Sequence, residues 1–315
     1  MTSDTLPTLR RALFAATCCA ALALLLGACA ATTPTRGPGR PRGGPEAPYP
    51  VVLTASDERR NRALAGWAAV LGDAAAASPT PELRPVTATP VAMPAGLTTP
   101  PRLPRVIIDD EAEQSEEETR ESLRRFIASA PALIGSELRD LALVGIADAP
   151  SGAGAKVARY HQRPFHYPLR NGYGEVEITF TPDLRVTALS STAIPEGERL
   201  RPLLRSVTRQ LTAEQAAAAL ASRGVAYTDA SGAQQTRAVA AGSDITPREL
   251  VVFPVGREGQ PPVLELHYAW ELEVGGAGAP LIVYVDAVSG EQLAATPAAS
   301  GAPAGSTPAP AAGGK

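Results

Sequence analysis

The sequence contains few cysteines and lysines, and each shortage excludes a class of protein. Cys18 and Cys19 fall in an apolar segment near the N-terminus, so the rest of the chain retains only Cys29. We therefore expect neither a disulfide framework nor a cysteine metal site. Lysine occurs only at Lys156 and Lys315, aromatic residues make up 4% of the chain, and the formal net charge is −3. This composition excludes the basic, aromatic surface that nucleic acid binding requires.

Catalytic motifs are also missing, and the three histidines are not arranged for metal binding. A zinc site needs three or four converging ligands, but His161 and His166 are expected to point to opposite faces of an extended segment. His267 shares a predicted strand face with Glu265 and Glu271, which would suit either a metal or a solvated polar face, and we favour the solvated face.

The sequence has no HExxH motif, nucleophile elbow or phosphate loop. The paired carboxylates do not lie in a recognisably apolar pocket, where the pKa of one of them would rise. We expect no enzymatic activity, no catalytic, cofactor-binding or metal-binding residues, and no small-molecule substrate. A hydrolase that depends on His267 and Glu265 remains an alternative.

The N-terminus has the features of an export signal. Arg10 and Arg11 precede an uncharged run over 12–26, which is shorter than the roughly 20 apolar residues of a membrane-spanning helix. The stretch Leu-Gly-Ala-Cys over 26–29 resembles the lipobox of bacterial lipoproteins. That resemblance implies that residues 1–28 are a signal peptide, and that the Cys29 thiol carries a diacylglycerol, typically with palmitate. The alternative is an ordinary signal peptide followed by an incidental cysteine.

The lipobox resemblance also implies where the protein is located. An exported chain with lipid on Cys29 would be anchored to the cell envelope, at the outer membrane or the cell membrane, and would face the periplasm or the exterior. Ala30 is not an aspartate, which in Gram-negative lipoproteins implies sorting to the outer membrane.

Three proline-rich stretches divide the chain, and we expect each to be extended and mobile because it lacks apolar residues to bury. They are a tether over 29–55, a linker over 78–105 and a tail over 296–315. Between the first two, residues 56–77 are predicted to form an amphipathic helix that begins at Ser56. This helix would dock on the folded region, pair with a partner or lie on lipid, and we favour docking.

Residues 106–200 are predicted to form the first folded unit. Ser115 and Glu118 make a capping box for a helix that carries Leu123, Phe126 and Ile127 on one face. Alternation of apolar and polar residues predicts strands after it. The predicted strands cover 138–148, 156–162, 174–180 and 185–191.

Residues 201–295 repeat this order. Thr212 and Gln215 form a capping box at the start of an alanine-rich helix, and Gly290 suits the left-handed position of a hairpin turn. Strands are predicted over 249–255, 263–274, 281–286 and 291–295. The sequence therefore predicts an α+β protein with two tandem units, each a helix on an antiparallel sheet, connected by disordered proline-rich linkers.

Two segments resemble known families. Residues 264–270 with Val-Asp-Ala-Val-Ser-Gly-Glu over 285–291 resemble the PepSY pattern. Residues 160–162, 167–169 and 174–178 resemble the motif of the fungalysin/thermolysin propeptide, although His166 stands where that family usually has glycine. In such proteins the tandem units form a pro-region that assists folding and blocks the catalytic cleft.

The resemblance implies a membrane-tethered, non-enzymatic binding module. We expect it to act as a peptidase inhibitor or as a folding chaperone of the metallopeptidase-propeptide type, with a secreted metallopeptidase as the candidate partner. The alternative is a structural or scaffolding lipoprotein of the envelope, whose sheet face or Trp67 helix holds a partner that is not a peptidase.

Overall fold

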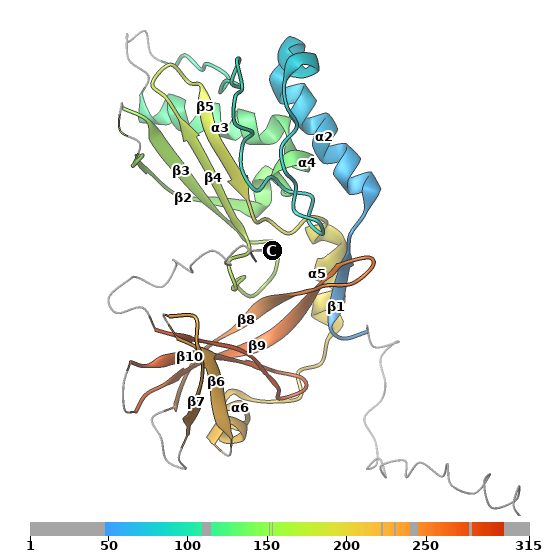
Figure 1. The fold of residues 1–315 in the computed structure, drawn as a ribbon, viewed down its shortest axis with the longest axis vertical. Helices are drawn as coiled ribbons and strands as arrows, with labels where there is room; N and C mark the ends of the chain where they lie inside the picture. The colour runs from blue at the N-terminus through green and yellow to red at the C-terminus, as the bar shows by residue number, and fades with distance from the viewer. Residues whose placement is uncertain are drawn as a thin grey trace, which may run out of the picture. The chain divides into compact units, whose positions relative to one another are not determined.

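Antiparallel sheets and a few helices make up the part of the chain that the structure describes (Figure 1). The computed structural model describes residues 48–108, 115–150, 152, 154–221, 223–229, 231–239, 245–276 and 279–298. Within these residues there are a four-stranded sheet, a five-stranded sheet and a separate two-stranded sheet, all with antiparallel pairing. The predicted α+β class is confirmed.

The four-stranded sheet, called the first sheet below, has the strand order β2-β3-β4-β5. Its strands are β2 (Leu141–Asp148), β3 (Lys156–Gln162), β4 (Glu175–Phe180) and β5 (Val186–Ser191). They correspond to the four predicted strands, except that Leu138–Asp140 forms a short 3-10 turn, η2, before β2. In β4 the predicted alternation is confirmed, because Val176, Ile178 and Phe180 are buried while the residues between them are half-buried.

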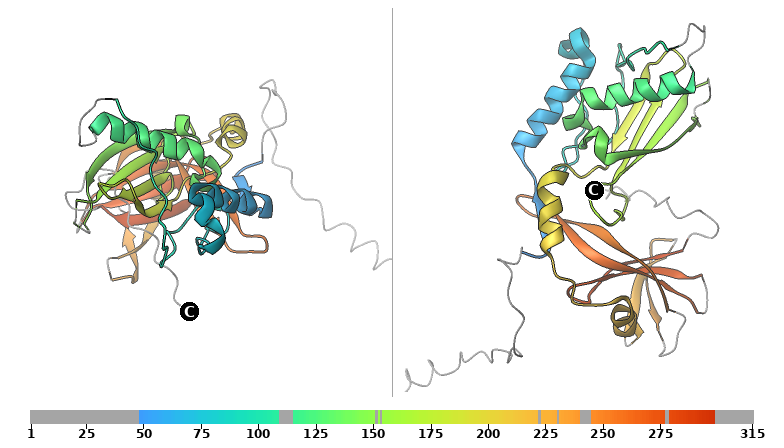
Figure 2. Two further views of the ribbon diagram at one scale, coloured as in Figure 1. Left: turned by 90° about the horizontal axis from the view of Figure 1, so that it is seen from above. Right: turned by 180° about the vertical axis from the view of Figure 1, so that it is seen from behind.

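Helix α3 (Glu116–Ser129) packs on one face of the first sheet (Figure 2). The Ser115 hydroxyl accepts the Glu118 N–H at 3.2 Å, and the Glu118 carboxylate accepts the Ser115 N–H at 2.9 Å. The predicted capping box is thus confirmed, and the short helix α4 (Pro131–Ile134) follows. The core between these helices and the sheet contains Leu123, Phe126, Ile127, Leu133, Tyr160, Val176, Ile178, Phe180 and Leu189.

The five-stranded sheet, called the second sheet, is built around β9. Its strands are β1 (Val51–Thr54), β8 (Ile245–Arg257), β9 (Val263–Val274), β10 (Leu281–Asp286) and β11 (Gln292–Pro297). Strand β8 pairs with the whole of β9 on one side. On the other side β1 pairs with residues 263–266 and β10 with residues 269–274.

Two helices cover one face of the second sheet. Leu200 and Leu204 of α5 (Gly197–Ser206) pack with Leu264 and Leu266 of β9. Farther along the same strand, α6 (Ala213–Ala221) packs its buried residues against Leu272 and Val274. The capping box predicted at the start of α6 is confirmed by reciprocal hydrogen bonds of 2.8 and 3.3 Å between Thr212 and Gln215.

Two parts of the second half were not predicted. The predicted unit boundary at residues 200 and 201 falls inside α5, which contains Pro202 within its last turns. The second missed part is a hairpin of β6 (Gly224–Thr228) and β7 (Gln234–Ala238), which forms the two-stranded sheet. Its polar strands lack the apolar alternation by which the other strands were predicted.

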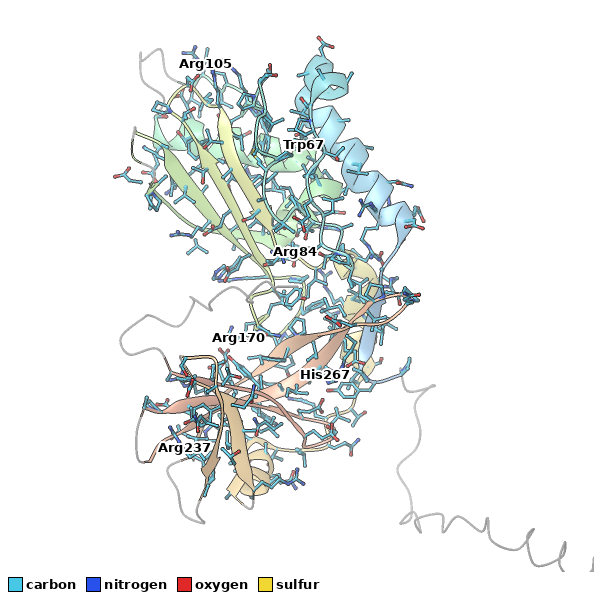
Figure 3. All side chains as sticks on the ribbon, in the orientation of Figure 1. Trp67, Arg84, Arg105, Arg170, Arg237 and His267 are labelled. Carbon is cyan, nitrogen blue, oxygen red and sulfur yellow. The ribbon has the colours of Figure 1, made fainter. Side chains whose placement is uncertain are left out.

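The predicted amphipathic helix docks on the folded region. Helix α2 (Asp57–Leu71) begins at Ser56, whose hydroxyl accepts the Arg59 N–H at 3.3 Å, and continues as the 3-10 helix η1 (Gly72–Ala77). The Trp67 side chain is buried in the core of the first sheet, and its indole N–H donates to the Pro79 carbonyl at 3.1 Å (Figure 3). Of the three alternatives for this helix, docking is the one observed.

The expected tether over 29–55 includes a strand, which corrects that prediction. Residues Val51–Thr54 form β1, with Val51 and Leu53 buried in the second sheet. A buried guanidinium fixes the end of this strand, because Arg59 donates to the Thr54 carbonyl at 3.0 Å, to the Val86 carbonyl at 2.6 Å and to the Glu196 carboxylate at 2.5 Å.

The linker over 78–105 is packed rather than extended and mobile, and this prediction was wrong. Leu83, Thr89 and Leu103 are buried. The segment closes the outer edge of β5: the Pro90 carbonyl accepts the Ser191 N–H at 3.0 Å, and the Pro101 carbonyl accepts the Val186 N–H at 2.8 Å. Proline lacks an N–H but keeps its carbonyl, so a proline-rich segment is able to cover the edge of a sheet.

Candidate functional site

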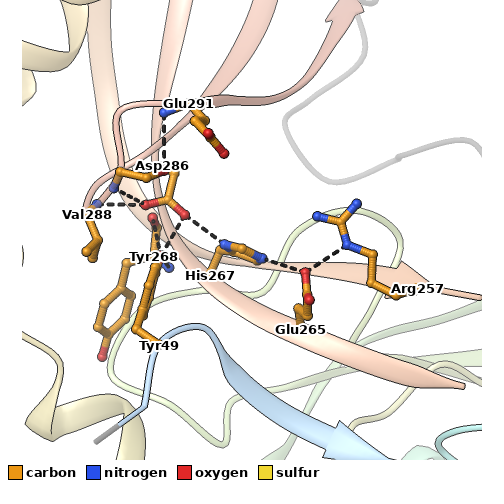
Figure 4. A network of polar contacts seen from close by, with 9 residues as sticks. Tyr49, Arg257, Glu265, His267, Tyr268, Asp286, Val288 and Glu291 are labelled. Atoms are coloured by element: carbon orange, nitrogen blue, oxygen red, sulfur yellow. Dashed lines mark hydrogen bonds and ion pairs between the residues drawn. The ribbon is translucent and has the colours of Figure 1, made fainter. Parts of the chain in front are cut away.

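The most developed polar cluster lies in the gap between β1 and β10 along β9 (Figure 4). Neither strand pairs with His267 and Tyr268, and the side chain of Tyr49 occupies this gap. The Tyr49 hydroxyl accepts the Tyr268 N–H at 3.1 Å and donates to Asp286 Oδ2 at 2.8 Å. The Tyr268 carbonyl accepts the Ala287 N–H at 2.7 Å, so the backbone of the gap is fully bonded.

His267 lies between two carboxylates in this cluster and is only 7% exposed. Its Nδ1 is 2.7 Å from Asp286 Oδ2, and its Nε2 is 3.3 Å from Glu265 Oε2. Neutral imidazole has one N–H donor, whereas imidazolium has two. Both nitrogens therefore face carboxylate oxygens of the same chain, which accept hydrogen bonds.

The charges of the cluster compensate one another. Arg257 Nε donates to Glu265 Oε2 at 2.8 Å, and Asp286 Oδ1 accepts the N–H groups of Val288 and Ser289 at 2.7 and 2.8 Å. Burial acts to raise the pKa of Asp286, but hydrogen bonds from His267 and these two N–H groups outweigh it and hold the pKa below its ordinary value.

The pKa values of Glu265 and Tyr49 are also set by burial together with the neighbouring groups of the cluster. Burial would raise the pKa of Glu265, but hydrogen bonds from Arg257 and His267 lower it below its ordinary value. Burial and the adjacent Asp286 raise the pKa of Tyr49 far above its ordinary value, so its hydroxyl stays a donor. The carboxyl groups of Asp286 and Glu265 therefore favour their charged forms, the Tyr49 hydroxyl favours its protonated form, and all three bond to groups of the same chain.

The structure corrects the expectation of a solvated polar face at His267. Glu265 contacts His267 as the strand pattern indicated, but the ring is buried by Tyr49, whose ring centroid is 5.7 Å away in an edge-on arrangement. Glu271 does not join them: its carboxylate binds Arg170 at 2.8 Å and Arg248 at 3.5 Å. In the part of the chain that the structure describes, no three His, Cys, Asp or Glu residues are placed to hold a metal ion.

The other two histidines lie elsewhere. His161 is half-buried on β3, opposite Glu175 of β4, and His166 is exposed in the following loop with its ring 4.7 Å from that of Tyr167. Sequence reasoning missed Tyr49 and Asp286. The "V-D-A-V-S-G-E" stretch was the available signal for Asp286, because an aspartate before a glycine-containing turn often binds the N–H groups of that turn.

The loop over 163–174 joins the first sheet to the second. Leu169 forms a parallel bridge with Val252 of β8, and the Val252 N–H donates to the Pro168 carbonyl at 2.9 Å. The Arg170 guanidinium binds Glu271 and Glu249 on the second sheet (Figure 3). At the base of the loop, the Gln162 amide makes two hydrogen bonds with the backbone of Ile194, at 2.8 and 2.9 Å.

A second candidate surface is the face of the first sheet opposite α3, which no described helix covers (Figures 1 and 2). We call it the open face; its residues are Arg159, His161, Glu175, Glu177 and Thr179. Arg159 Nε donates to Glu177 Oε1 at 2.6 Å. Partial burial raises the pKa of Glu175, although the nearby His161 lowers it in part.

Cys29, the predicted lipidation residue, and the predicted signal peptide over 1–28 lie outside the described residues. Among the residues that are described, no helix has both the length and the apolar character needed to cross a membrane.

No family model matches the sequence, and no curated protein matches it. Among solved structures, the chain is similar to the Bacillus megaterium YpeB C-terminal domain. The similarity has 10% sequence identity and a TM-score of 0.25, and it covers 68% of this chain and 74% of the other.

Proposed function

We propose that this protein is a non-enzymatic protein-binding module, exported and anchored to the cell envelope by lipid on Cys29. Its partner is a secreted metallopeptidase, which it inhibits or helps to fold in the manner of a metallopeptidase propeptide. The observation that carries the proposal is the open face, where charged and polar side chains of two adjacent strands, β3 and β4, are left without a covering helix.

The open face has the character of a docking surface. Arg159 and Glu177 are about half exposed and carry opposite charges, so a partner with complementary charges would be oriented on the sheet. The rim of such an interface is polar, and complementary charges mainly improve specificity and association rate.

The contacts of the His267 ring favour a binding role over the alternative of a hydrolase. That alternative depends on His267 and Glu265, but both ring nitrogens of His267 face carboxylates of the same chain. A general base needs a nitrogen lone pair that reaches a substrate proton. In this arrangement the ring is already used to connect β9 with β10.

The proposal is tested by titrating purified full chain into thermolysin-type metallopeptidases and measuring peptide hydrolysis and binding. We expect the chain either to slow hydrolysis of the peptide or to bind the peptidase without being cleaved itself. Arg159→Glu should weaken this binding. Arg60→Glu is the matched control, because Arg60 is exposed on α2, away from the open face. Full peptidase activity and no binding with every peptidase would reject the role of inhibitor or chaperone.

The alternative is a scaffolding lipoprotein that uses the same face for a non-peptidase partner. The Trp67 helix is a poor candidate for this role because Trp67 is buried within the fold. A photoreactive residue in place of Thr179 on the open face would distinguish the two in intact envelope, according to which protein it labels. The anchor itself is tested by mass spectrometry of the mature N-terminus, where an unmodified Cys29 would reject it.

A further inference from the structure

The loop over 163–174 contains the sequence Asn171-Gly172, in a chain that has only two asparagines. Both residues take positive φ angles, 59° at Asn171 and 70° at Gly172. The Tyr173 N–H donates to the Arg170 carbonyl at 3.3 Å and closes a tight turn around them. Asn-Gly is favoured where a turn needs two successive positive φ angles, so the backbone explains both residue types.

The side chain of Asn171 fastens this turn to the second sheet. Its amide group donates to the Pro254 carbonyl of β8 at 2.8 Å. Beside this contact, the Arg170 N–H donates to the Val252 carbonyl at 3.1 Å, and the Val252 N–H donates to the Pro168 carbonyl at 2.9 Å. The Asn171 amide is therefore one of a short series of hydrogen bonds by which the loop follows the outer edge of β8.

Asparagine is a chemically labile residue, because its side-chain amide reacts with the backbone. The nitrogen of the next residue attacks the side-chain carbonyl carbon, and a carbon–nitrogen bond forms. The amide nitrogen takes up the proton of that N–H and leaves as ammonia, and a succinimide ring remains. Water then opens the ring at one of its two carbonyls and yields aspartate or isoaspartate. The only co-reactant is water, and no electrons are transferred.

The turn meets the requirements of this reaction. Asn171 is exposed, so water reaches its amide. Gly172 has no Cβ to shield its nitrogen, and among the residues that the structure describes its N–H donates no hydrogen bond. The contact with Pro254 restrains the amide and slows the reaction. The second asparagine, Asn61, is also exposed, but it lies inside α2 and precedes an arginine.

We infer that Asn171 is a site of deamidation, and that its conversion releases this end of the loop from β8. The Pro254 carbonyl only accepts hydrogen bonds, and a carboxylate at position 171 also only accepts them. The bond is therefore lost and two oxygens face each other. In isoaspartate the main chain also passes through the former side chain, and the longer backbone no longer fits the turn. The change is irreversible, so the released form accumulates with the age of the molecule.

The modification is tested by incubating the purified full chain in mildly alkaline buffer and mapping its peptides by mass spectrometry. Digestion with pepsin in acid avoids deamidation during preparation. We expect aspartate and isoaspartate to accumulate at position 171, while Asn61 stays unchanged over the same time. An intact Asn171, or conversion of the two asparagines at equal rates, would overturn the inference.

The release of the loop is tested by hydrogen exchange at the N–H groups of Arg170 and Val252. We expect Asn171→Asp to speed exchange at both by about tenfold, in proportion to the loss of one hydrogen bond. Asn61→Asp is the matched control, because it makes the same change of charge on α2, and it should leave both rates unchanged. Equal exchange in the two variants would overturn the release. Neither measurement involves a peptidase, so the result does not depend on the proposed function.

Discussion

Tyr49 and Asp286 are joined by a hydrogen bond of 2.8 Å although they are 237 positions apart in the sequence. The same Tyr49 hydroxyl accepts the N–H of Tyr268, so a side chain takes the place of a strand residue where β1 and β10 fail to meet. A buried N–H that loses its acceptor destabilises a fold. The contact therefore closes the second sheet as well as linking its first and later strands.

We expect Tyr49→Phe to lower the free energy of unfolding by about 1–3 kcal/mol, because the Tyr268 N–H loses its acceptor and Asp286 loses a donor. Urea unfolding followed by circular dichroism measures the change. Tyr227→Phe is the matched control, since the Tyr227 hydroxyl makes no hydrogen bond among the described residues, and it should differ little from wild type. Equal stability of the two variants would contradict the assigned contact.

We expect stability to fall in acid, in part because of Asp286. Its pKa is lowered in the folded chain from the ordinary value of 3.8. A lowered carboxyl pKa stabilises the fold above the ordinary value, and this stabilisation is lost as the pH falls through the folded pKa. Asp286→Asn should lower stability at pH 7 by about 3–5 kcal/mol, because it leaves His267 with a poorer partner.

The measurement for Asp286 is urea unfolding of wild type and Asp286→Asn from pH 7 to pH 2. The difference between the two proteins should shrink as the pH falls below 3.8. A difference that is constant over the whole range would show that the Asp286 carboxylate does not stabilise the fold through its charge.

Arg59 is predicted to hold three segments together. Arg59→Met should cost about 3–5 kcal/mol, because the buried guanidinium loses its ion pair with the half-buried Glu196 and its hydrogen bonds to the carbonyls of Thr54 and Val86. The adjacent exposed Arg60, changed to methionine, is the control and should change stability by less than about 0.5 kcal/mol. Thermal unfolding of both variants provides the comparison.

A substitution at Gly135 tests whether the segment over 82–103, which contains Thr89, packs against the first folded unit. A Cβ at Gly135 would lie 2.3 Å from Thr89 Cγ2, and its φ is +79°. Gly96 has a similar φ of +78° but open space around it. Gly96→Ala should cost about 1–2 kcal/mol from backbone strain alone, and Gly135→Ala should cost more because of the added overlap. Equal losses in urea unfolding would contradict the packing of Thr89.

The regular elements were predictable because their signals are local. The period-two pattern over 264–274 predicted β9, and the capping residues at Ser115 and Thr212 predicted the helix starts. Gly290 takes a φ of +76° in the predicted turn. In each case the physical cause acts within a few residues, so a single sequence contains it.

The missed features depend on partners that are distant in the sequence. Strand β1 has only four residues, and its stability comes from pairing with β9. The proline-rich segment is ordered by the N–H groups of β5, which its composition does not reveal. His267 was placed on the correct strand face beside Glu265, but its burial depends on Tyr49, which was assigned to the tether.

The separation between β1 and β9 also constrains how the chain folds. On the ribosome, Val51 and Leu53 emerge long before the strand with which they pair. These residues cannot pair with β9 until most of the chain has been synthesised. Pairing between segments so distant in sequence is also slow. Premature termination anywhere before Asp286 would also leave Tyr49 without its acceptor. Completion of the second sheet is therefore a late event that depends on both ends of the folded region.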